Sequence, residues 1–237
     1  MTGPPRLDIL SAGAAKAVVL ALAGELRERD RMDVAGVFDA AGAIRTRFVE
    51  GAPCDVLLLP ASMLDELAVQ QRVDPDSRAP LGCVPTGIAI ASGAPAPRIH
   101  DADALRATFD TASALYCPDT ERSTAGLHFV QILRKMGIYS NVAARIRDYA
   151  NGAQAMAALA ATAAPERAIG CTQVTEILYT PGVTLIGPLP PPFELATTYS
   201  AAASVTSRHP DTARRFVAML TGSHSRELRA ASGFAPA

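Results

Sequence analysis

The stretch from Leu7 to Leu26 places a short apolar run directly before an Ala-, Leu- and Val-rich segment with helical spacing. The two parts meet at Ser11-Ala12-Gly13, which predicts a strand, a tight turn and a helix. Small residues at such a turn let a bound group approach the backbone, and the N–H groups of the first helical turn have no partner within the helix. This helix end therefore attracts anions, although α/β proteins commonly have such turns without binding anything there.

Two more strand-and-helix units follow in the first third of the chain. The predicted elements are a strand over 33–38, a helix over 43–49, a strand over 56–59 and a helix over 63–71. The run at 56–59 is apolar throughout, which is typical of a parallel strand covered on both faces. The alternation predicts an α/β protein with right-handed crossovers. Ligands of such sheets bind beyond the carboxyl ends of the strands, where Ser11 and Asp39 lie.

The rest of the chain contains a second alternating set. Strands are predicted over 84–91, 113–116, 145–149, 168–172, 183–186 and 194–205, and helices over 127–136, 152–161, 209–220 and 227–231. Asp101 is a predicted N-cap for a helix that ends at Ala107. Residues 74–80 are predicted to be a loop, and 187–193, with its run of prolines, a rigid connector. The polar loop 118–126 leads into the helix over 127–136, so an anion-attracting helix end recurs.

Charge and cysteine content exclude several classes of function. Twenty-two Lys and Arg residues face 23 Asp and Glu residues, a net charge of -1, so bulk electrostatics favours neither nucleic acid nor an anionic membrane. The longest apolar stretches are short or interrupted by charges, so no membrane span is predicted. No C-x-x-C pair, metal-ligand cluster, phosphate-binding loop or catalytic Ser-His-Asp order is present, and no cofactor is predicted. The four cysteines are predicted to be buried small hydrophobic residues.

The N-terminus, residues 1–6, leads directly into the first predicted strand. It lacks the basic segment, apolar segment and cleavage site of a secretory signal peptide, which predicts a cytoplasmic protein. If a signal peptide has been removed from this chain, the prediction becomes a periplasmic protein with an ABC permease as its partner.

Four segments together resemble the molybdate-binding protein family, which has the type II periplasmic-binding-protein fold. They are Ser11-Ala-Gly-Ala14, Gly51-Ala-Pro-Cys-Asp-Val56, Thr124-Ala-Gly126 and the closing helix from Pro210 to Leu220. The resemblance implies two α/β lobes, each a mainly parallel sheet flanked by helices, with two crossing segments and a ligand cleft between the lobes. Lobe I is then expected over 1–85 with 200–237, and lobe II over 86–199.

The family's binding positions carry over unevenly. The family commonly has a hydroxyl residue near Gly13 and another near Gly42, where this chain has glycines, with Ser11 and Asp39 nearby. This departure weakens molybdate itself as the ligand. The helix start at Thr124-Ala125 matches better, and the resemblance also places Gln173 and a ligand-facing Tyr199. The predicted ligand-binding residues are Ser11, Ala12, Gly13, Lys16, Gly42, Arg122, Ser123, Thr124, Ala125, Gln173 and Tyr199.

Several of these side chains have two interpretations. Asp39 repels a dianionic ligand unless it caps its own helix, which is the commoner role of Asp in that position. Arg122 either pairs with a ligand carboxylate or is a solvated loop residue beside Glu121. Lys16 faces either the cleft or solvent. His128 is either a general acid or base or, more commonly for one His on a helix, a structural residue.

Two functions from different classes remain. The first is binding of a small anion, a carboxylate or an oxyanion, which helix ends and hydroxyl groups suffice to hold. The alternative is a cytoplasmic isomerase of an unsaturated di- or tricarboxylate, because relatives of the resembled family, aconitate isomerase among them, act on tricarboxylates. Such an enzyme needs a base to move a proton next to a carboxylate. The candidate bases are Lys16, Asp39, His128 and Tyr199.

Overall fold

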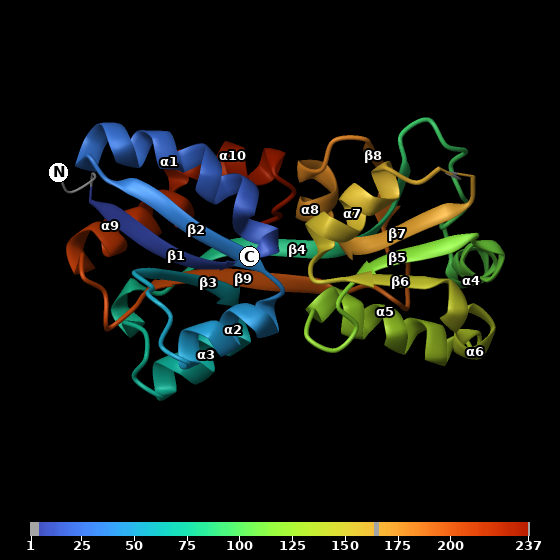
Figure 1. Cartoon of the computed structure of the whole chain (residues 1–237), viewed down its shortest axis with the longest axis horizontal. Coiled ribbons are helices and arrows are strands. Elements are labelled where there is room, and N and C mark those ends of the chain that lie inside the picture. Colours follow the sequence, from blue (N-terminus) through green and yellow to red (C-terminus); the bar gives the residue numbers. More distant parts are fainter. Residues whose placement is uncertain (1–4, 164–165, 237) are drawn as a thin grey trace. The chain divides into compact units, whose positions relative to one another are not determined.

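The computed structural model describes residues 5–163 and 166–236 and confirms the predicted α/β fold (Figure 1). The chain forms two compact units, Met1–Cys83 with Thr198–Ala237, and Val84–Thr197. Two strands connect them, β4 (Ala79–Ala91) and β9 (Ala196–Ala203). Both unit boundaries lie two residues before the positions expected from the sequence. Residues 1–4, on which the signal-peptide prediction largely rests, lie outside the described residues.

Unit 1, the unit of the two chain ends, is built on a sheet in the order β2-β1-β3-β9. β1 (Arg6–Ala12) pairs in parallel with β2 (Asp33–Asp39) and β3 (Val56–Pro60), and β9 runs antiparallel to β3. Ala12 pairs with Asp39, so the carboxyl ends of β1 and β2 lie side by side. The loops after β1 and β2, which were predicted to contact a ligand, therefore begin at the same end of the parallel strands.

Helices cover both faces of the unit 1 sheet. The elements are η1 (Gly13–Ala15), α1 (Lys16–Asp30), α2 (Ala41–Val49), α3 (Ala61–Val69), η2 (Pro75–Ser77), α9 (Pro210–Thr221), η4 (Ser223–Ser225) and α10 (Arg226–Ala231). Figure 1 shows α1 packed beside α9, with α2 and α3 on the other side of the strands. The four leucine and valine side chains of β3 are fully buried, as expected of a strand covered on both faces.

Unit 2 contains a sheet in the order β4-β7-β5-β6, with β8 on the other side of β4. Its strands are β4, β5 (Ala114–Pro118), β6 (Ile146–Tyr149), β7 (Ala168–Gln173) and β8 (Val183–Pro188). β5 is parallel to β6 and β7, whereas β4 is antiparallel to β7 and β8. The helices are α4 (Ala102–Thr111), α5 (Thr124–Lys135), α6 (Tyr139–Val142), η3 (Ala143–Arg145), α7 (Gly152–Ala160) and α8 (Val174–Tyr179).

Alternate residues of β7 contribute to two separate cores in unit 2. Ile169 and Cys171 join the cluster formed with α4, α5 and α6, whereas Ala168 joins the cluster formed with α7 and α8. A Cβ atom at Gly170 would lie 2.6 Å from Met156 of α7, which explains the small residue there. By this alternation, Thr172 belongs to the α7 side of the sheet and Gln173 to the α5 side.

The Gly51-Ala-Pro-Cys-Asp segment has a structural role. Gly51 follows α2 with a φ of +89°, a conformation that glycine adopts without strain. Asp55 is 2% exposed, and its carboxylate accepts hydrogen bonds from the Asp8 N–H at 2.8 Å, the Ser207 hydroxyl at 2.7 Å and the Arg208 N–H at 2.9 Å. This one side chain therefore joins β1, the start of β3 and the turn after β9.

Several expectations differ from the structure. The helix after Asp101, expected to end at Ala107, continues to Thr111. The predicted loop over 74–80 contains η2 and the first residues of β4, a strand that was expected only from residue 84. The helix expected over 127–136 begins at Thr124, because Ser123 occupies the N-cap position. Cys83, predicted to be buried, is half-buried, with its Sγ 3.1 Å from the Thr198 hydroxyl; the other three cysteines are buried.

Among residues 5–163 and 166–236, no helix has the length and apolar character that a membrane crossing requires. The same residues contain no group of three or more His, Cys, Asp or Glu side chains that could hold a metal ion.

Candidate functional site

The first predicted ligand loop follows β1. Ser11 is fully buried, and its hydroxyl donates to the carbonyl oxygen of Ala12 at 2.8 Å. Gly13 then begins η1, which continues into α1, and neither η1 nor α1 has a side-chain cap. The N–H groups at the start of η1 have no acceptor within the helix. Lys16, the first residue of α1, has its Nζ 5.8 Å from the centre of the Phe38 ring.

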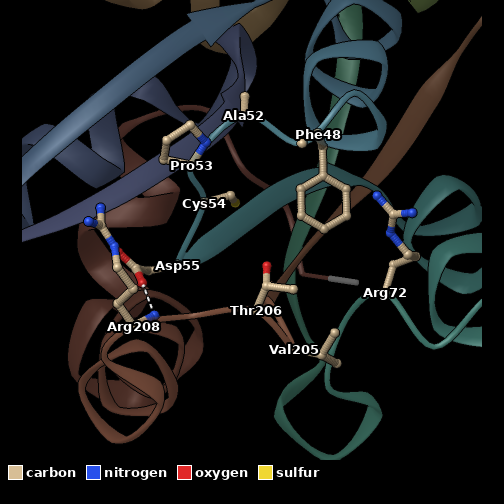
Figure 2. A pocket seen from close by; sticks show the side chains of 10 residues that line it. Phe48, Ala52, Pro53, Cys54, Asp55, Arg72, Val205, Thr206 and Arg208 are labelled. Carbon is tan, nitrogen blue, oxygen red and sulfur yellow. Dashed lines mark hydrogen bonds between the residues drawn. The ribbon is translucent and has the colours of Figure 1, made fainter.

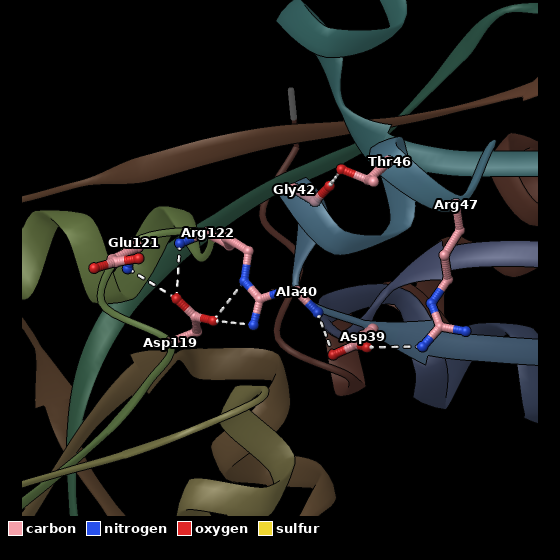
Figure 3. A network of polar contacts seen from close by, with 8 residues as sticks. All are labelled: Asp39, Ala40, Gly42, Thr46, Arg47, Asp119, Glu121 and Arg122. Carbon is pink, nitrogen blue, oxygen red and sulfur yellow. Dashed lines mark hydrogen bonds and ion pairs between the residues drawn. The ribbon is translucent and has the colours of Figure 1, made fainter. Parts of the chain in front are cut away.

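The second loop follows β2, and its acidic residue, Asp39, is paired with an arginine and a backbone N–H group. Oδ1 of Asp39 accepts a hydrogen bond from the Ala40 N–H at 2.9 Å, and Oδ2 lies 3.7 Å from Nη2 of Arg47 (Figure 3). Asp39 thus binds the backbone one residue before α2, whose own first turn has no side-chain cap. Gly42 lies in that first turn, and its carbonyl accepts the Thr46 hydroxyl at 3.0 Å.

In unit 2, the loop after β5 is organised by an acidic residue that sequence reasoning missed. Asp119 accepts N–H groups of Glu121 and Arg122 through Oδ1, at 2.8 and 2.9 Å, and binds the Arg122 guanidinium through Oδ2 (Figure 3). Burial raises the pKa of Asp119, but these hydrogen bonds and the arginine charge outweigh burial and lower the pKa overall. Arg122 therefore pairs with Asp119 rather than with Glu121, and its side chain stays 64% exposed.

The start of α5 is packed tightly against this loop. Ser123 is the N-cap, with its hydroxyl 3.5 Å from the Gly126 N–H, and Thr124 and the buried Ala125 follow. A Cβ atom at Gly126 would lie 2.2 Å from the Asp119 carbonyl oxygen. The glycine is therefore required for the loop to lie on the first helical turn. The structure brings Arg122, Ser123, Thr124 and Ala125 together at the carboxyl end of β5.

Gln173 ends β7 and is 3% exposed, yet neither atom of its side-chain amide has a hydrogen-bond partner among the described residues. Thr86, which pairs with it across β4, is 1% exposed and its hydroxyl likewise lacks a partner there. Residues opposite one another in an antiparallel pair share a face of the sheet. Buried polar groups are almost always hydrogen-bonded in proteins, so these atoms mark a place for a ligand or for water.

The neighbouring helix end in unit 2 is already occupied. Glu176 is 6% exposed; it accepts the Thr172 hydroxyl at 2.6 Å, and its Oε2 lies against Gly152 at the start of α7. Burial raises the pKa of Glu176, and the Thr172 hydroxyl and the backbone N–H groups of Gly152, Ala153 and Gln173 oppose the shift without cancelling it. The sequence placed Glu176 in a short helix without a role, because its contact with the start of α7 joins residues far apart in the chain.

Two further candidates are held in structural contacts. Nε2 of His128 lies 2.8 Å from the Phe193 carbonyl oxygen, and since a carbonyl only accepts, Nε2 carries the proton and Nδ1 is the nitrogen that can accept one. The ring of Tyr199 is 3% exposed and packs edge-on against Phe234, with ring centres 6.4 Å apart.

A pocket of about 640 Å³ in unit 1 lies at the opposite end of the parallel strands from the predicted ligand loops (Figure 2). Its lining includes Cys54 and Asp55, which precede β3, so it faces the amino end of a strand whose carboxyl end adjoins Ser11. Burial raises the pKa of the Cys54 thiol to about 12, which makes it unreactive. The polar groups here are engaged, since Arg208 binds Asp8 at 2.7 Å and Arg72 donates to the Val49 carbonyl at 3.1 Å.

Residues 7–235 match the family model described as bacterial extracellular solute-binding protein. The chain belongs to this family. A curated relative, aconitate isomerase from Pseudomonas sp, is 29% identical over 97% of this chain and 87% of its own length.

Solved structures of the family's fold cover almost the whole chain. The periplasmic molybdate-binding protein of Azotobacter vinelandii superposes with a TM-score of 0.79 at 18% identity, over 98% of this chain and 99% of its own. A sulfate-binding protein from Mycobacterium tuberculosis H37Rv superposes with a TM-score of 0.73 at 17% identity, over 98% and 87%. The resemblance stated from the sequence is thereby confirmed at the level of the family and its fold.

Proposed function

We propose that this protein binds a small anion, a carboxylate or an oxyanion, through the residues at the carboxyl ends of its parallel strands. The single observation that carries the proposal is the Gln173 side chain, whose amide is buried without any partner among the described residues. Leaving one such polar atom unpaired costs about 1–3 kcal/mol, so a bound group that pairs with it is stabilised accordingly.

The helix starts supply the attraction for negative charge. α1 and α2 begin without side-chain caps in unit 1, and in unit 2 α5 begins beside Arg122. A helix end contributes about 0.3–1 kcal/mol to anion binding at an exposed site and up to about 2 kcal/mol in a partly buried one. Micromolar affinity corresponds to about -8 kcal/mol, to which helix ends contribute one part and hydrogen bonds the rest.

A thermal-shift screen tests this proposal. Molybdate, tungstate, sulfate, phosphate and a set of mono-, di- and tricarboxylates are added separately to the purified protein. A ligand at 100 times its dissociation constant adds about 2.7 kcal/mol of stability, which raises Tm clearly. Gln173→Leu, which removes both amide atoms at similar size, should reduce the shift to about half or less. A flat response of the unmodified protein to every anion would contradict the proposal.

A second candidate is isomerisation of an unsaturated di- or tricarboxylate, favoured by the 29% identity to an aconitate isomerase over nearly the whole chain. In this reaction a base removes a proton next to a carboxylate, the double bond moves by one carbon, and a proton returns at the far end. Lys16, Asp39 and His128 are the bases that we propose; Nε2 of His128 donates to a carbonyl, which leaves Nδ1 as its basic nitrogen. The ring of Tyr199 is packed on Phe234. Helix ends would stabilise the enolate-like anion.

Deuterium exchange separates the enzyme from the binder. cis- and trans-Aconitate are incubated with the protein in deuterated water and followed by NMR. Isomerisation, or deuterium uptake next to a carboxylate, would identify the enzyme; Lys16→Met and Asp39→Asn should then lower the rate by about 10²–10⁴-fold if the residue is the base. If an acid binds tightly but neither exchanges deuterium nor isomerises, binding is the one function of the two that is supported.

The compartment and the partner are part of the same proposal. The matched family is described as extracellular, which favours an exported protein that delivers its ligand to a membrane permease. Fractionation of cells that carry the native gene tests this. Recovery by osmotic shock supports the exported binder, and recovery only with cytosolic markers supports the isomerase.

A further inference from the structure

The carboxyl group of Glu176 lies at the first turn of α7. Its Oε2 accepts the Thr172 hydroxyl at 2.6 Å and lies against Gly152, and the nearby backbone N–H groups of Gly152, Ala153 and Gln173 act to lower its pKa against the effect of burial. Gly152 and Ala153 are the first two residues of α7, so their N–H groups have no acceptor within the helix. The side chain of Glu176 thus fills the position that a bound anion takes at a helix N-terminus.

Gly152 shows that the chain makes room for this carboxyl group. A Cβ atom at Gly152 would lie 2.0 Å from Oε2 of Glu176 and 2.1 Å from the Thr172 hydroxyl oxygen. Glycine is a poor helix former, and alanine would favour this helical position by about 1 kcal/mol if space allowed. The backbone of α7 therefore approaches the carboxyl group as closely as only a glycine permits.

The same carboxyl group reaches the strand that carries the proposed ligand contact. The backbone N–H of Gln173 is among the groups that act to lower its pKa, while the side-chain amide of Gln173 has no partner among the described residues. Alternation along β7 directs Thr172 to the α7 face and Gln173 to the α5 face. Glu176 thus holds the end of β7 from one face, and the amide remains available on the other.

We propose that the Glu176 side chain occupies the start of α7 in place of an external anion. Glu176 thereby prevents this helix end from binding the ligand, and it positions Gln173 as the ligand-facing group of β7. The positioning of Gln173 toward a ligand rests on the proposed function, whereas the occupation of the α7 start by Glu176 is independent of it. A consequence follows for selectivity: the ligand of this protein must be held in unit 2 by α5 and Gln173, without the N–H groups of α7.

Formate is the probe for the helix start, since it is the smallest carboxylate and fits the space that the Glu176 carboxyl group leaves. Tm is measured at increasing formate concentration for the unmodified protein, Glu176→Ala and the double variant Glu176→Ala/Gly152→Ala. Glu176→Ala should lower Tm by roughly 5–10 °C, because buried N–H groups lose their acceptor. Formate should raise the Tm of this variant further than it raises that of the unmodified protein, by binding in the vacated position.

The double variant is the matched control, because its added Cβ fills the position of the lost carboxyl group. It should lose the extra formate response. Gly152→Ala alone should be destabilising, and it should be less so once Glu176 is Ala, when the Thr172 hydroxyl is the close contact that remains. Glu176→Gln keeps the size of the side chain but turns an NH₂ group toward N–H donors, so it should also lower Tm. An equal formate response of Glu176→Ala and the double variant, or a Glu176→Gln protein as stable as the unmodified one, would overturn the proposal.

The ligand arm is measured separately, with an anion that binds in the thermal-shift screen. Glu176→Gln should weaken that anion at least about 10-fold, and Gln173→Leu should abolish the difference between Glu and Gln at position 176. If no anion binds the unmodified protein, the proposed function fails while the formate result stands. If an anion binds and Glu176→Gln leaves its affinity unchanged, the positioning role of Glu176 is wrong.

Discussion

Arg122 and Asp119 form an ion pair within one loop, in which Nε and Nη2 of the arginine reach the same carboxylate oxygen, at 2.7 and 2.6 Å. The other oxygen of Asp119 accepts two backbone N–H groups. The arginine is therefore oriented by its own loop, and its side chain is 64% exposed. Preorganised groups lose less freedom on binding, which suits Arg122 to the recognition of a carboxylate.

We predict that Arg122→Ala and Thr124→Val weaken anion binding and leave the fold intact. Loss of a charge-assisted hydrogen bond costs about 1.5–3 kcal/mol, or about 10- to 100-fold in Kd. Calorimetric titration measures the change, and Arg106→Ala, an exposed arginine on α4, serves as the control. Unchanged affinity in both site variants would place the ligand elsewhere.

Stability should fall in acid partly through Asp119. Its pKa is below the ordinary value near 3.8, so its ionised form is favoured by folding. A carboxyl group of this kind contributes stability above its unfolded pKa and loses that contribution as pH falls through the lower folded pKa. Asp119→Asn should therefore lower the urea midpoint at pH 6 and converge with the unmodified protein near pH 2. A constant difference at every pH would show that ionisation of Asp119 is irrelevant.

Asp55→Ala should destabilise unit 1 by about 2–5 kcal/mol. The substitution removes the acceptor of three hydrogen bonds and leaves the N–H groups of Asp8 and Arg208 unpaired. Urea denaturation provides the measurement, with Asp76→Ala, an exposed acidic residue of η2, as the comparison. A loss no larger than that of the comparison would mean that the junction at Asp55 is not important for stability.

Native-state labelling with iodoacetamide at pH 8 should modify Cys83 first. Burial raises the pKa of Cys54 and of Cys117 to about 12, and Cys171 is also buried with a raised pKa, so little thiolate forms at these three positions. Cys83 is half-buried. Peptide mass mapping over time would give the order, and early modification of Cys54 or Cys117 would contradict the burial described here.

The sequence predicted most elements because each has a local cause. The apolar run at 56–59 became β3, and Asp101 caps α4 through a hydrogen bond of 2.8 Å to the Ala104 N–H. Boundaries shifted where one side chain decides them, as with Ser123 at the start of α5. The pair Asp119 and Arg122, three residues apart in a loop, was readable in principle from its spacing.

The rest depends on contacts between distant parts of the chain. The contact of Glu176 with the start of α7 joins residues 152 and 176, and no short sequence pattern predicts it. The role of Asp55 likewise depends on Asp8 and Arg208, which lie far away in sequence. Whether the Gln173 amide has a hydrogen-bond partner depends on which groups from other parts of the chain lie around it. Only the structure shows that it has none among the described residues.

Calorimetric titration of one small carboxylate into the unmodified protein and into Gln173→Leu tests the central claim most directly. The carboxylate used is the one that gives the largest thermal shift, and circular dichroism confirms that the variant is folded. We predict one-to-one binding at micromolar Kd to the unmodified protein and at least a 10-fold weaker Kd for the variant. Equal affinity in the two proteins, or no heat of binding with any anion tested, would contradict the account.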